Sequence, residues 1–161
     1  MDAYEAGLQK LSALFSQDRT FVLATVKGSK PSQRVVDTYY DEGVFWIVTY
    51  AQSTKVKELR MNPQVSLCNS FHTFSGRAYY AGHPLDEQNK DIRAKLIQVF
   101  EPWYFAHNNE ADKDMCYVRI ALSEGFFILM VSDISWILKS MKLKLFLLLR
   151  KSVCYRFKQV M

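Results

Sequence analysis

The stretch that decides the fold runs from Thr20 to Tyr50 and reads TFVLATVKGSKPSQRVVDTYYDEGVFWIVTY. It is rich in the β-branched and aromatic residues that are typical of strands. Two groups of turn residues, at 28–31 and 41–43, divide it into three segments. Strands that are joined by such short turns must run antiparallel. The stretch therefore predicts three consecutive antiparallel strands.

Helices are predicted on both sides of this stretch. Leucine side chains fall on one face of residues 3–17, which predicts an amphipathic opening helix. A short helix from Ser53 to Met61 should follow the third strand, because an Asn-Pro pair comes directly after it. A longer helix is expected over residues 84–100, which begin with proline and carry an apolar face.

Further strands are predicted between and after these helices. Segments 64–71 and 76–84 are strand-like, and we place the link between them at His72–Ser75. Residues 115–122, MCYVRIAL, form the last predicted strand. Because turn-linked strands dominate, the sequence predicts a mainly β (α+β) fold, a small antiparallel β-barrel with peripheral helices.

The junction between the third strand and the short helix carries an unusual group of side chains. Ser53, Thr54 and Lys55 are consecutive at the start of the helix. The first N–H groups of a helix lack partners and bear partial positive charge, so a lysine there opposes the helix dipole unless an anion lies nearby. The junction is therefore a candidate anion site. The alternative is an ordinary helix cap beside a surface lysine.

An arginine on the neighbouring strand favours the anion site. Arg34 alternates with Val36 along the second strand, which directs it into the small barrel. A buried arginine needs an anionic partner, and its planar fork matches phosphate bidentately. The sequence therefore predicts a phosphate clamp, with Arg77 as a further contact. The clamp residues are Arg34, Thr49, Ser53, Thr54 and Lys55.

Charge and cysteine content limit the classes of function. The net charge of +5 comes from residues 123–161, which hold seven Lys/Arg against two acids, so residues 1–122 are neutral. A neutral body argues against nucleic acid as a partner. The three cysteines have no metal-ligand spacing and no pairing pattern. Residues 1–10 contain no apolar run, so we expect a cytoplasmic protein.

The run RVVDTYYDEGVFWIVTYAQSTKVKELRMNPQVSL, residues 34–67, resembles a known family. It is similar to the FMN-binding split barrels of the pyridoxamine 5′-phosphate oxidase-like superfamily, and within it to the general stress protein and nitroimidazole-resistance branch. The resemblance extends over about residues 5–127. It implies a split β-barrel, an FMN cofactor, and a homodimer with the flavin at the subunit interface.

The resemblance also implies roles for individual residues. Arg34, Ser53 and Lys55 match the residues that hold the FMN phosphate, and Thr54 stands where relatives often carry a second basic residue. Thr49 matches a hydroxyl at a strand end that contacts flavin. The remaining implied contacts are the backbone of Val35, Val36 and Asp37 along the isoalloxazine edge and a polar contact from Arg77.

The implied activity is a flavin-dependent oxidoreductase that acts on a small molecule which the sequence does not identify. The substrate-binding carboxy-terminal segment of the oxidase has no equivalent here, so a true pyridoxamine phosphate oxidase is not expected. Two alternatives stay open: a non-catalytic flavin-binding stress-response module, and a haem or deazaflavin binder on the same fold. No catalytic residue and no metal ligand is assigned. Roles for His72, His107 and Trp103 are left open.

Residues 128–161 differ in character from the rest of the chain. They are basic and apolar, whereas the resemblance implies a glycine turn and an acidic–aromatic strand after residue 127. With permitted codons, a shifted reading frame over residues 128–146 encodes such a segment. We therefore hypothesise one domain at 1–127 and a frameshifted tail at 128–161, which sequencing of the DNA would test. No apolar run in the tail is long enough for a membrane span.

Overall fold

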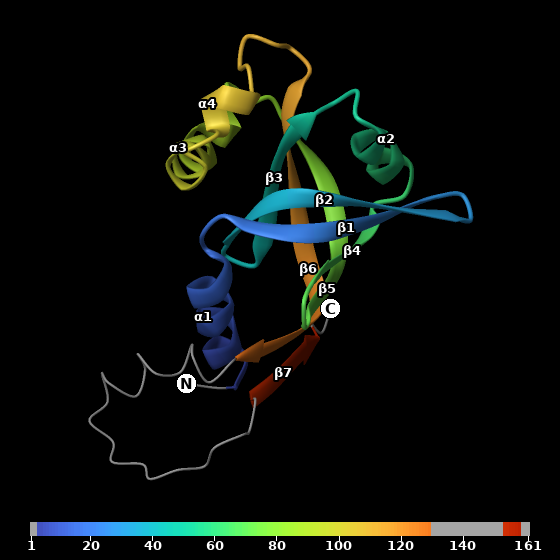
Figure 1. Cartoon of the computed structure of the whole chain (residues 1–161), viewed down its shortest axis with the longest axis vertical. Coiled ribbons are helices and arrows are strands. Elements are labelled where there is room, and N and C mark those ends of the chain that lie inside the picture. Colours follow the sequence, from blue (N-terminus) through green and yellow to red (C-terminus); the bar gives the residue numbers. More distant parts are fainter. Residues whose placement is uncertain (1–2, 130–152, 159–161) are drawn as a thin grey trace.

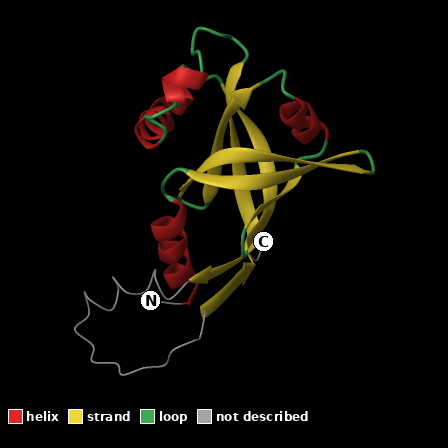
Figure 2. Cartoon of the chain, in the orientation of Figure 1, coloured by secondary structure: helices red, strands yellow, loops and turns green. Residues whose placement is uncertain are grey.

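The computed structural model describes residues 3–129 and 153–158. Within these residues, six antiparallel strands form a closed barrel, and a seventh extends its sheet at one end (Figure 1). Four α-helices and one 3-10 helix of the described chain lie outside the strands (Figure 2). The predicted mainly β split barrel with peripheral helices is confirmed. The elements in chain order are α1 (Ala3–Phe15), β1 (Arg19–Lys27), β2 (Lys30–Asp41), β3 (Val44–Tyr50), α2 (Thr54–Met61), β4 (Gln64–Asn69), β5 (His72–Gly82), η1 (Glu87–Asn89), α3 (Lys90–Val99), α4 (Tyr104–His107), β6 (Met115–Leu129) and β7 (Val153–Lys158).

The three consecutive strands predicted from residues 20–50 are β1, β2 and β3, and two tight turns fix their register. Gly28 has φ of 60° at the β1–β2 turn, and Gly43 has φ of 89° after Glu42 at the β2–β3 turn. Positive φ at these positions matches the right-handed twist of a hairpin, and glycine adopts it without steric cost. The glycines therefore determine which residues of these strands face each other.

Two pairings close the barrel. β1 pairs with β2 on one side and β4 on the other, and the order continues through β5 to β6. β3 then pairs with β6 along its whole length, from Val44 opposite Ala121 to Tyr50 opposite Met115. β2, by contrast, pairs with β3 only over its last residues, 39–41. The earlier part of β2 therefore leaves one edge without a strand partner among the described residues.

Large apolar side chains fill the barrel. Phe15 from α1 enters one end, where its ring lies within 6 Å, centroid to centroid, of Phe21, Phe45 and Phe74. Edge-to-face and tilted contacts of this kind add stability beyond the area that they bury. Val56 and Leu59 of α2 belong to the same core, although α2 lies outside the strands.

A second apolar cluster lies under α3 and α4. It includes a hydrogen-bonded chain in which the Tyr104 and Tyr117 hydroxyls lie 2.5 Å apart and Tyr104 donates to Glu110. Arg93 completes the chain with two hydrogen bonds to Glu110, of 2.7 and 2.6 Å. Burial raises the pKa of Tyr117 to about 12. These contacts hold the two helices against the outer face of β3 and β6.

Three details differ from the sequence-based expectations. The link placed at His72–Ser75 is wrong: the turn lies at residues 70–71, and β5 already begins at His72 because Phe74 is needed in the core. The helix expected over 84–100 begins later, as η1 and then α3, and the Asn89 side chain ties this start to the end of β5 by donating to the carbonyls of Ala81 and His83. β6 also continues past residue 122.

β7 (Val153–Lys158) pairs antiparallel with the end of β6, from Val153 opposite Leu129 to Lys158 opposite Glu124. Residues 130–152 and 159–161 of the predicted atypical tail lie outside the described residues. The frameshift and the domain boundary at 127 therefore stay predictions.

Gly76 offers a stability test of the β5–β6 packing. A Cβ added there would overlap the carbonyl oxygen of Ala121, next to a register shift in the sheet. We expect Gly76→Ala to lower the free energy of unfolding by about 3 kcal/mol, because a backbone atom cannot move aside. Urea denaturation measures the change.

Gly7 provides the matched control. It lies within α1, and a Cβ added there meets nothing within 4 Å. Gly7→Ala should raise the free energy of unfolding by about 0.5–1 kcal/mol, as expected for a helix interior. Equal effects of the two substitutions would contradict the described packing.

Candidate anion site at the start of α2

The polypeptide leaves β3 and enters α2 through Ser53, which occupies the N-cap position. Its backbone has the extended conformation of a cap, with φ −64° and ψ 147°, yet its side chain makes no capping hydrogen bond. The Ser53 hydroxyl is buried and has no hydrogen-bond partner among the residues that the structure describes. A buried hydroxyl without a partner costs free energy, so it is a candidate contact for a ligand group that the chain itself does not supply.

Lys55, in the first turn of α2, carries the second polar group of this junction. Burial lowers the pKa of Lys55, and the positive charge of Arg34 lowers it further. Within the described part of the chain, no carboxylate forms a salt bridge with Lys55. A half-buried cation that is repelled by a neighbouring cation is stabilised by an incoming anion.

Arg34 does lie on the inner face of β2, as predicted, but it has a partner in the protein. Its Nη2 lies 2.8 Å from Oε2 of Glu58 on α2, and 2.6 Å from the hydroxyl of Ser32. Its Nη1 donates to the hydroxyl of Thr25, which in turn donates to Glu58 over 2.5 Å. The side chains of Arg34 and Glu58 are 20% and 7% exposed, so this is a largely buried ion pair.

Glu58 was not predicted from the sequence. Its position between Val56 and Leu59, both of which face the core, was a usable signal, because an acid next to such residues in a helix that covers a sheet requires a cationic partner. The hydrogen bond from Thr25 and the charge of Arg34 lower the pKa of Glu58, while burial opposes them. The carboxylate is therefore ionised at neutral pH.

The other predicted contacts lie along β2 and at the end of β3. Thr49 is buried and faces Cys116 across the β3–β6 pairing. Val36 is buried, whereas Val35 and Asp37 point outward. The backbone of residues 35–37 pairs with β1 on one side, and its other edge lies in the part of β2 that β3 does not cover. Backbone groups at such an edge are available to a ligand.

Arg77 is not brought to this site within one chain. It lies exposed on β5, opposite Gln64 and Ala121 and on the other side of the sheet from the core residue Ala78. Two exposed residues share its face, Tyr79 and, on β6, Arg119, whose guanidinium lies 4.9 Å from the Tyr79 ring centroid. The residues of the predicted clamp therefore do not all meet within one chain: one group lies at α2, and Arg77 lies on β5.

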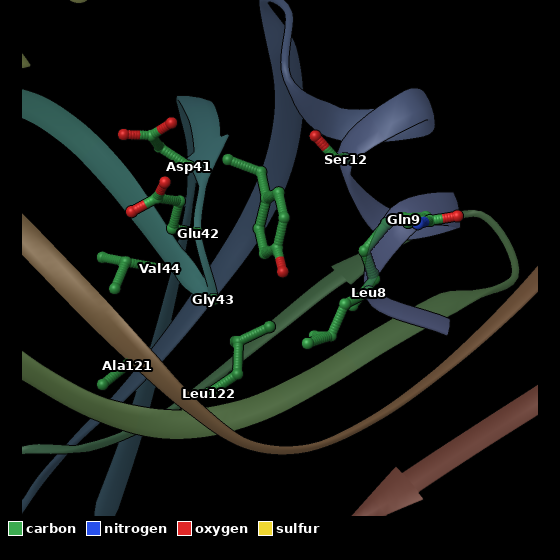
Figure 3. A pocket seen from close by; sticks show the side chains of 11 residues that line it. Leu8, Gln9, Ser12, Asp41, Glu42, Gly43, Val44, Ala121 and Leu122 are labelled. Atoms are coloured by element: carbon green, nitrogen blue, oxygen red, sulfur yellow. The ribbon is translucent and has the colours of Figure 1, made fainter. Parts of the chain in front are cut away.

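A cavity of about 590 Å³ adjoins the start of α2. Lysines from the tip of the β1–β2 hairpin line it, so it adds positive charge beside the junction. A larger cavity of about 690 Å³ lies between α1 and the β2–β3 turn (Figure 3), and none of the predicted cofactor-binding residues lines it. The residues around the smaller cavity are Lys27, Lys30, Pro31, Ser32, Thr54 and Glu58.

The residues whose roles were left open have structural contacts. His72 packs edge-on against Phe15, with ring centroids 5.2 Å apart. His107 ends α4 and is exposed. Trp103 stacks on Phe100 and donates to Asp18 over 2.9 Å. These three side chains thus belong to the α1 end of the barrel and to the α3–α4 region.

Two kinds of feature are absent from the described residues. Over 3–129 and 153–158, no cluster of three or more His, Cys, Asp or Glu side chains is arranged to hold a metal ion. None of the described helices combines the length and apolar character needed to cross a membrane.

A closed barrel of six antiparallel strands with peripheral helices has the architecture of a split barrel. The chain belongs to the pyridoxamine 5′-phosphate oxidase family, whose sequence profile matches residues 8–128. No curated protein sequence matches the chain. The family that the sequence resembled is thereby confirmed.

Solved structures share the fold at low sequence identity. General stress protein 26 from Bacillus anthracis str. Sterne is 18% identical with a TM-score of 0.57, over 73% of this chain and 89% of that one. A pyridoxamine 5′-phosphate oxidase-related FMN-binding protein from Nostoc punctiforme is 12% identical with a TM-score of 0.54, over 80% and 84%. A heme-binding protein from Mycobacterium smegmatis is 14% identical with a TM-score of 0.57, over 78% and 54%.

The lowered pKa of Glu58 leads to a prediction about acid stability. A depressed folded-state pKa contributes stability that is present above the unfolded value of about 4.5 and is lost as the pH falls through the folded value. Glu58→Gln should therefore be less stable than wild type at about pH 7, and the difference should shrink towards about pH 3. Urea denaturation across this range measures it, with the exposed Glu101→Gln as control. A difference that is independent of pH would contradict the ion pair.

Proposed function

We propose that this chain is an FMN-binding split-barrel protein in which the start of α2 holds the flavin phosphate. The observation that carries the proposal is the buried Ser53 hydroxyl without a partner, next to the uncompensated charge of Lys55. Both groups lie at a helix N-terminus, where backbone N–H groups favour an anion. A phosphate would satisfy the hydroxyl, the lysine and these N–H groups together.

The remaining implied contacts fit a flavin ring that extends from this phosphate. The uncovered edge of β2 at residues 35–37 offers backbone donors and acceptors to the polar edge of an isoalloxazine. Along the chain, Thr49 near the end of β3 comes after residues 35–37 and before the start of α2. Its side chain is buried. Bound FMN would supply hydride and electron transfer, while these residues bind and orient it.

We further propose a homodimer in which each site is completed by the partner. Arg77 is on a face that does not meet Arg34 within the chain, and it lies next to the exposed ring of Tyr79. A second copy would bring Arg77 to the flavin of the first. The exposed Val35 on β2 is also consistent with an interface at the uncovered strand edge.

The activity that we propose is flavin-dependent oxidation or reduction of a small molecule in the cytoplasm. Two alternatives are tested at the same time: a flavin-binding module without turnover, and a haem binder, as the heme-binding neighbour with the same fold indicates. The absorbance of purified protein that has been incubated with FMN or haem separates the two cofactors. Bleaching of bound flavin by NADH or NADPH favours an enzyme, and a bound flavin that neither reductant bleaches favours the module.

Substitutions at the junction test the phosphate site. Ser53→Ala should weaken FMN binding by about 1 kcal/mol without loss of stability, because its hydroxyl bonds to nothing that is described in the chain. Lys55→Met should weaken FMN binding by about 2 kcal/mol, the order expected for a charge-assisted contact. Titration followed by flavin fluorescence measures both affinities.

Matched controls are available for both substitutions. Ser29→Ala changes an exposed hydroxyl in the β1–β2 turn, and Lys57→Met changes an exposed lysine on the same helix. Neither control should alter FMN affinity. If Ser53→Ala and Lys55→Met bind FMN as tightly as these controls, the phosphate does not lie at the start of α2.

Mixed dimers test the contribution of Arg77. Lys55→Met and Arg77→Gln homodimers should each bind FMN weakly. If Arg77 acts on the partner's site, a dimer that contains one chain of each variant has one site with both residues intact. Random mixing should then restore full affinity to about a quarter of all sites. A mixture that recovers no tight binding would show that Arg77 does not act across an interface.

A further inference from the structure

The buried carboxylate of Glu58 lies beside the proposed phosphate site and has no part in the function proposed above. It projects from the inner face of α2, with its side chain 7% exposed. Its Oε2 accepts from the hydroxyl of Thr25 and from Nη2 of Arg34. An acidic group next to an anion site would repel the ligand, so its presence requires an explanation.

We propose that Glu58 is a positioning residue for the phosphate site, a proposal that rests on the proposed FMN function. Together with Thr25 and Ser32, it fixes the guanidinium of Arg34 in one orientation. Nη1 is held by Thr25, and Nη2 is held by both Ser32 and Glu58. A side chain with several rotatable bonds is thereby fixed before any ligand arrives, which lowers the entropic cost of binding.

The hydrogen-bond inventory of Arg34 defines what remains for a ligand. A guanidinium has five N–H donors. The two hydrogens of Nη2 are used by Ser32 and Glu58, and those of Nη1 by the hydroxyl of Thr25 and, over 3.5 Å, by the backbone carbonyl of Ser32. Nε alone has no acceptor among the described residues. Arg34 therefore offers a single contact and its charge, rather than the bidentate fork predicted from the sequence.

Because the ion pair between Arg34 and Glu58 is largely buried, we expect it to persist when phosphate binds. Removing one partner from a buried pair leaves an unpaired buried charge, which is strongly destabilising. A phosphate that displaced Glu58 from Arg34 would produce this situation. Lys55 has no carboxylate partner among the described residues, so it is free to supply the direct charge. Arg34 then serves as a fixed cation behind the site, held by Glu58.

The opposite role for Glu58 makes the opposite prediction. If Glu58 merely competed with phosphate for Arg34, neutralising it would strengthen phosphate binding. If it positions Arg34, neutralising it loosens the guanidinium and weakens phosphate binding. Glu58→Gln separates the two, because glutamine keeps the shape and an acceptor oxygen but removes the charge.

The experiment compares FMN with riboflavin, which has the same ring and no phosphate. For Glu58→Gln we expect FMN affinity to fall about tenfold and riboflavin affinity to change less than about twofold, the order of one misplaced charge-assisted contact. Thr25→Val should act in the same direction, because it removes the hydroxyl that links Arg34 to Glu58 while both charges remain. The exposed Glu101→Gln, with the same charge change, should alter neither affinity.

The outcomes separate this proposal from the proposed function. Wild-type protein that binds FMN no more tightly than riboflavin would overturn the phosphate site itself, and the positioning role with it. A wild-type preference for FMN that survives in Glu58→Gln, or that increases, would overturn only the positioning role. A loss of both affinities together would also overturn it, because that result indicates general damage to the fold.

A second readout does not depend on flavin. Inorganic phosphate should raise the thermal midpoint of the wild-type protein, since a ligand that binds the folded state stabilises it. The increase should be smaller in Glu58→Gln and unchanged in Glu101→Gln. An equal increase in wild type and Glu58→Gln would overturn the positioning role.

Discussion

The pairing of β3 with β6 is the constraint on which the rest of this structure depends. It closes the barrel by joining the third strand to the sixth, so it needs the whole chain from Val44 to Met115 to be in place. It also draws β3 away from most of β2, which leaves the β2 edge uncovered at residues 35–37. The same pairing fixes Thr49 opposite Cys116, shortly before the chain enters α2 through Ser53. Closure of the barrel therefore sets both the uncovered β2 edge and the point from which the chain enters α2.

The start of α2 is the place where the chain departs from local stability rules. A serine at the N-cap does not cap, and a lysine in the first turn meets a second cation rather than an anion. Elsewhere in the described part of the chain, buried side-chain polar atoms have partners, as the contacts of Thr25 and Glu58 illustrate. Natural sequences break such rules where function requires it. The proposed phosphate would resolve these conflicts together, whereas an ordinary surface helix cap would not produce them.

Local residue patterns were sufficient to predict much of the fold and part of the site. Gly28 and Gly43, with alternating apolar residues between them, predicted β1, β2 and β3, and the inward direction of Arg34 followed from its spacing to Val36. The turn between β4 and β5 was misplaced because no local pattern shows that Phe74 belongs to the core, and only the folded barrel buries it. The partner of Arg34 was missed because Glu58 is distant in sequence and only the packing of α2 brings it close.

The sequence by itself determined the antiparallel strands, the start of α2 and the candidate residues Ser53 and Lys55, because turn geometry, side-chain alternation and helix-end chemistry are local. Tertiary structure alone decided that Arg34 is tied to Glu58 and that Arg77 faces away from it. It also decided that the β2 edge is uncovered. These facts depend on which distant strands pair and which helix face is buried, and no local pattern specifies a contact between residues that only closure of the barrel brings together.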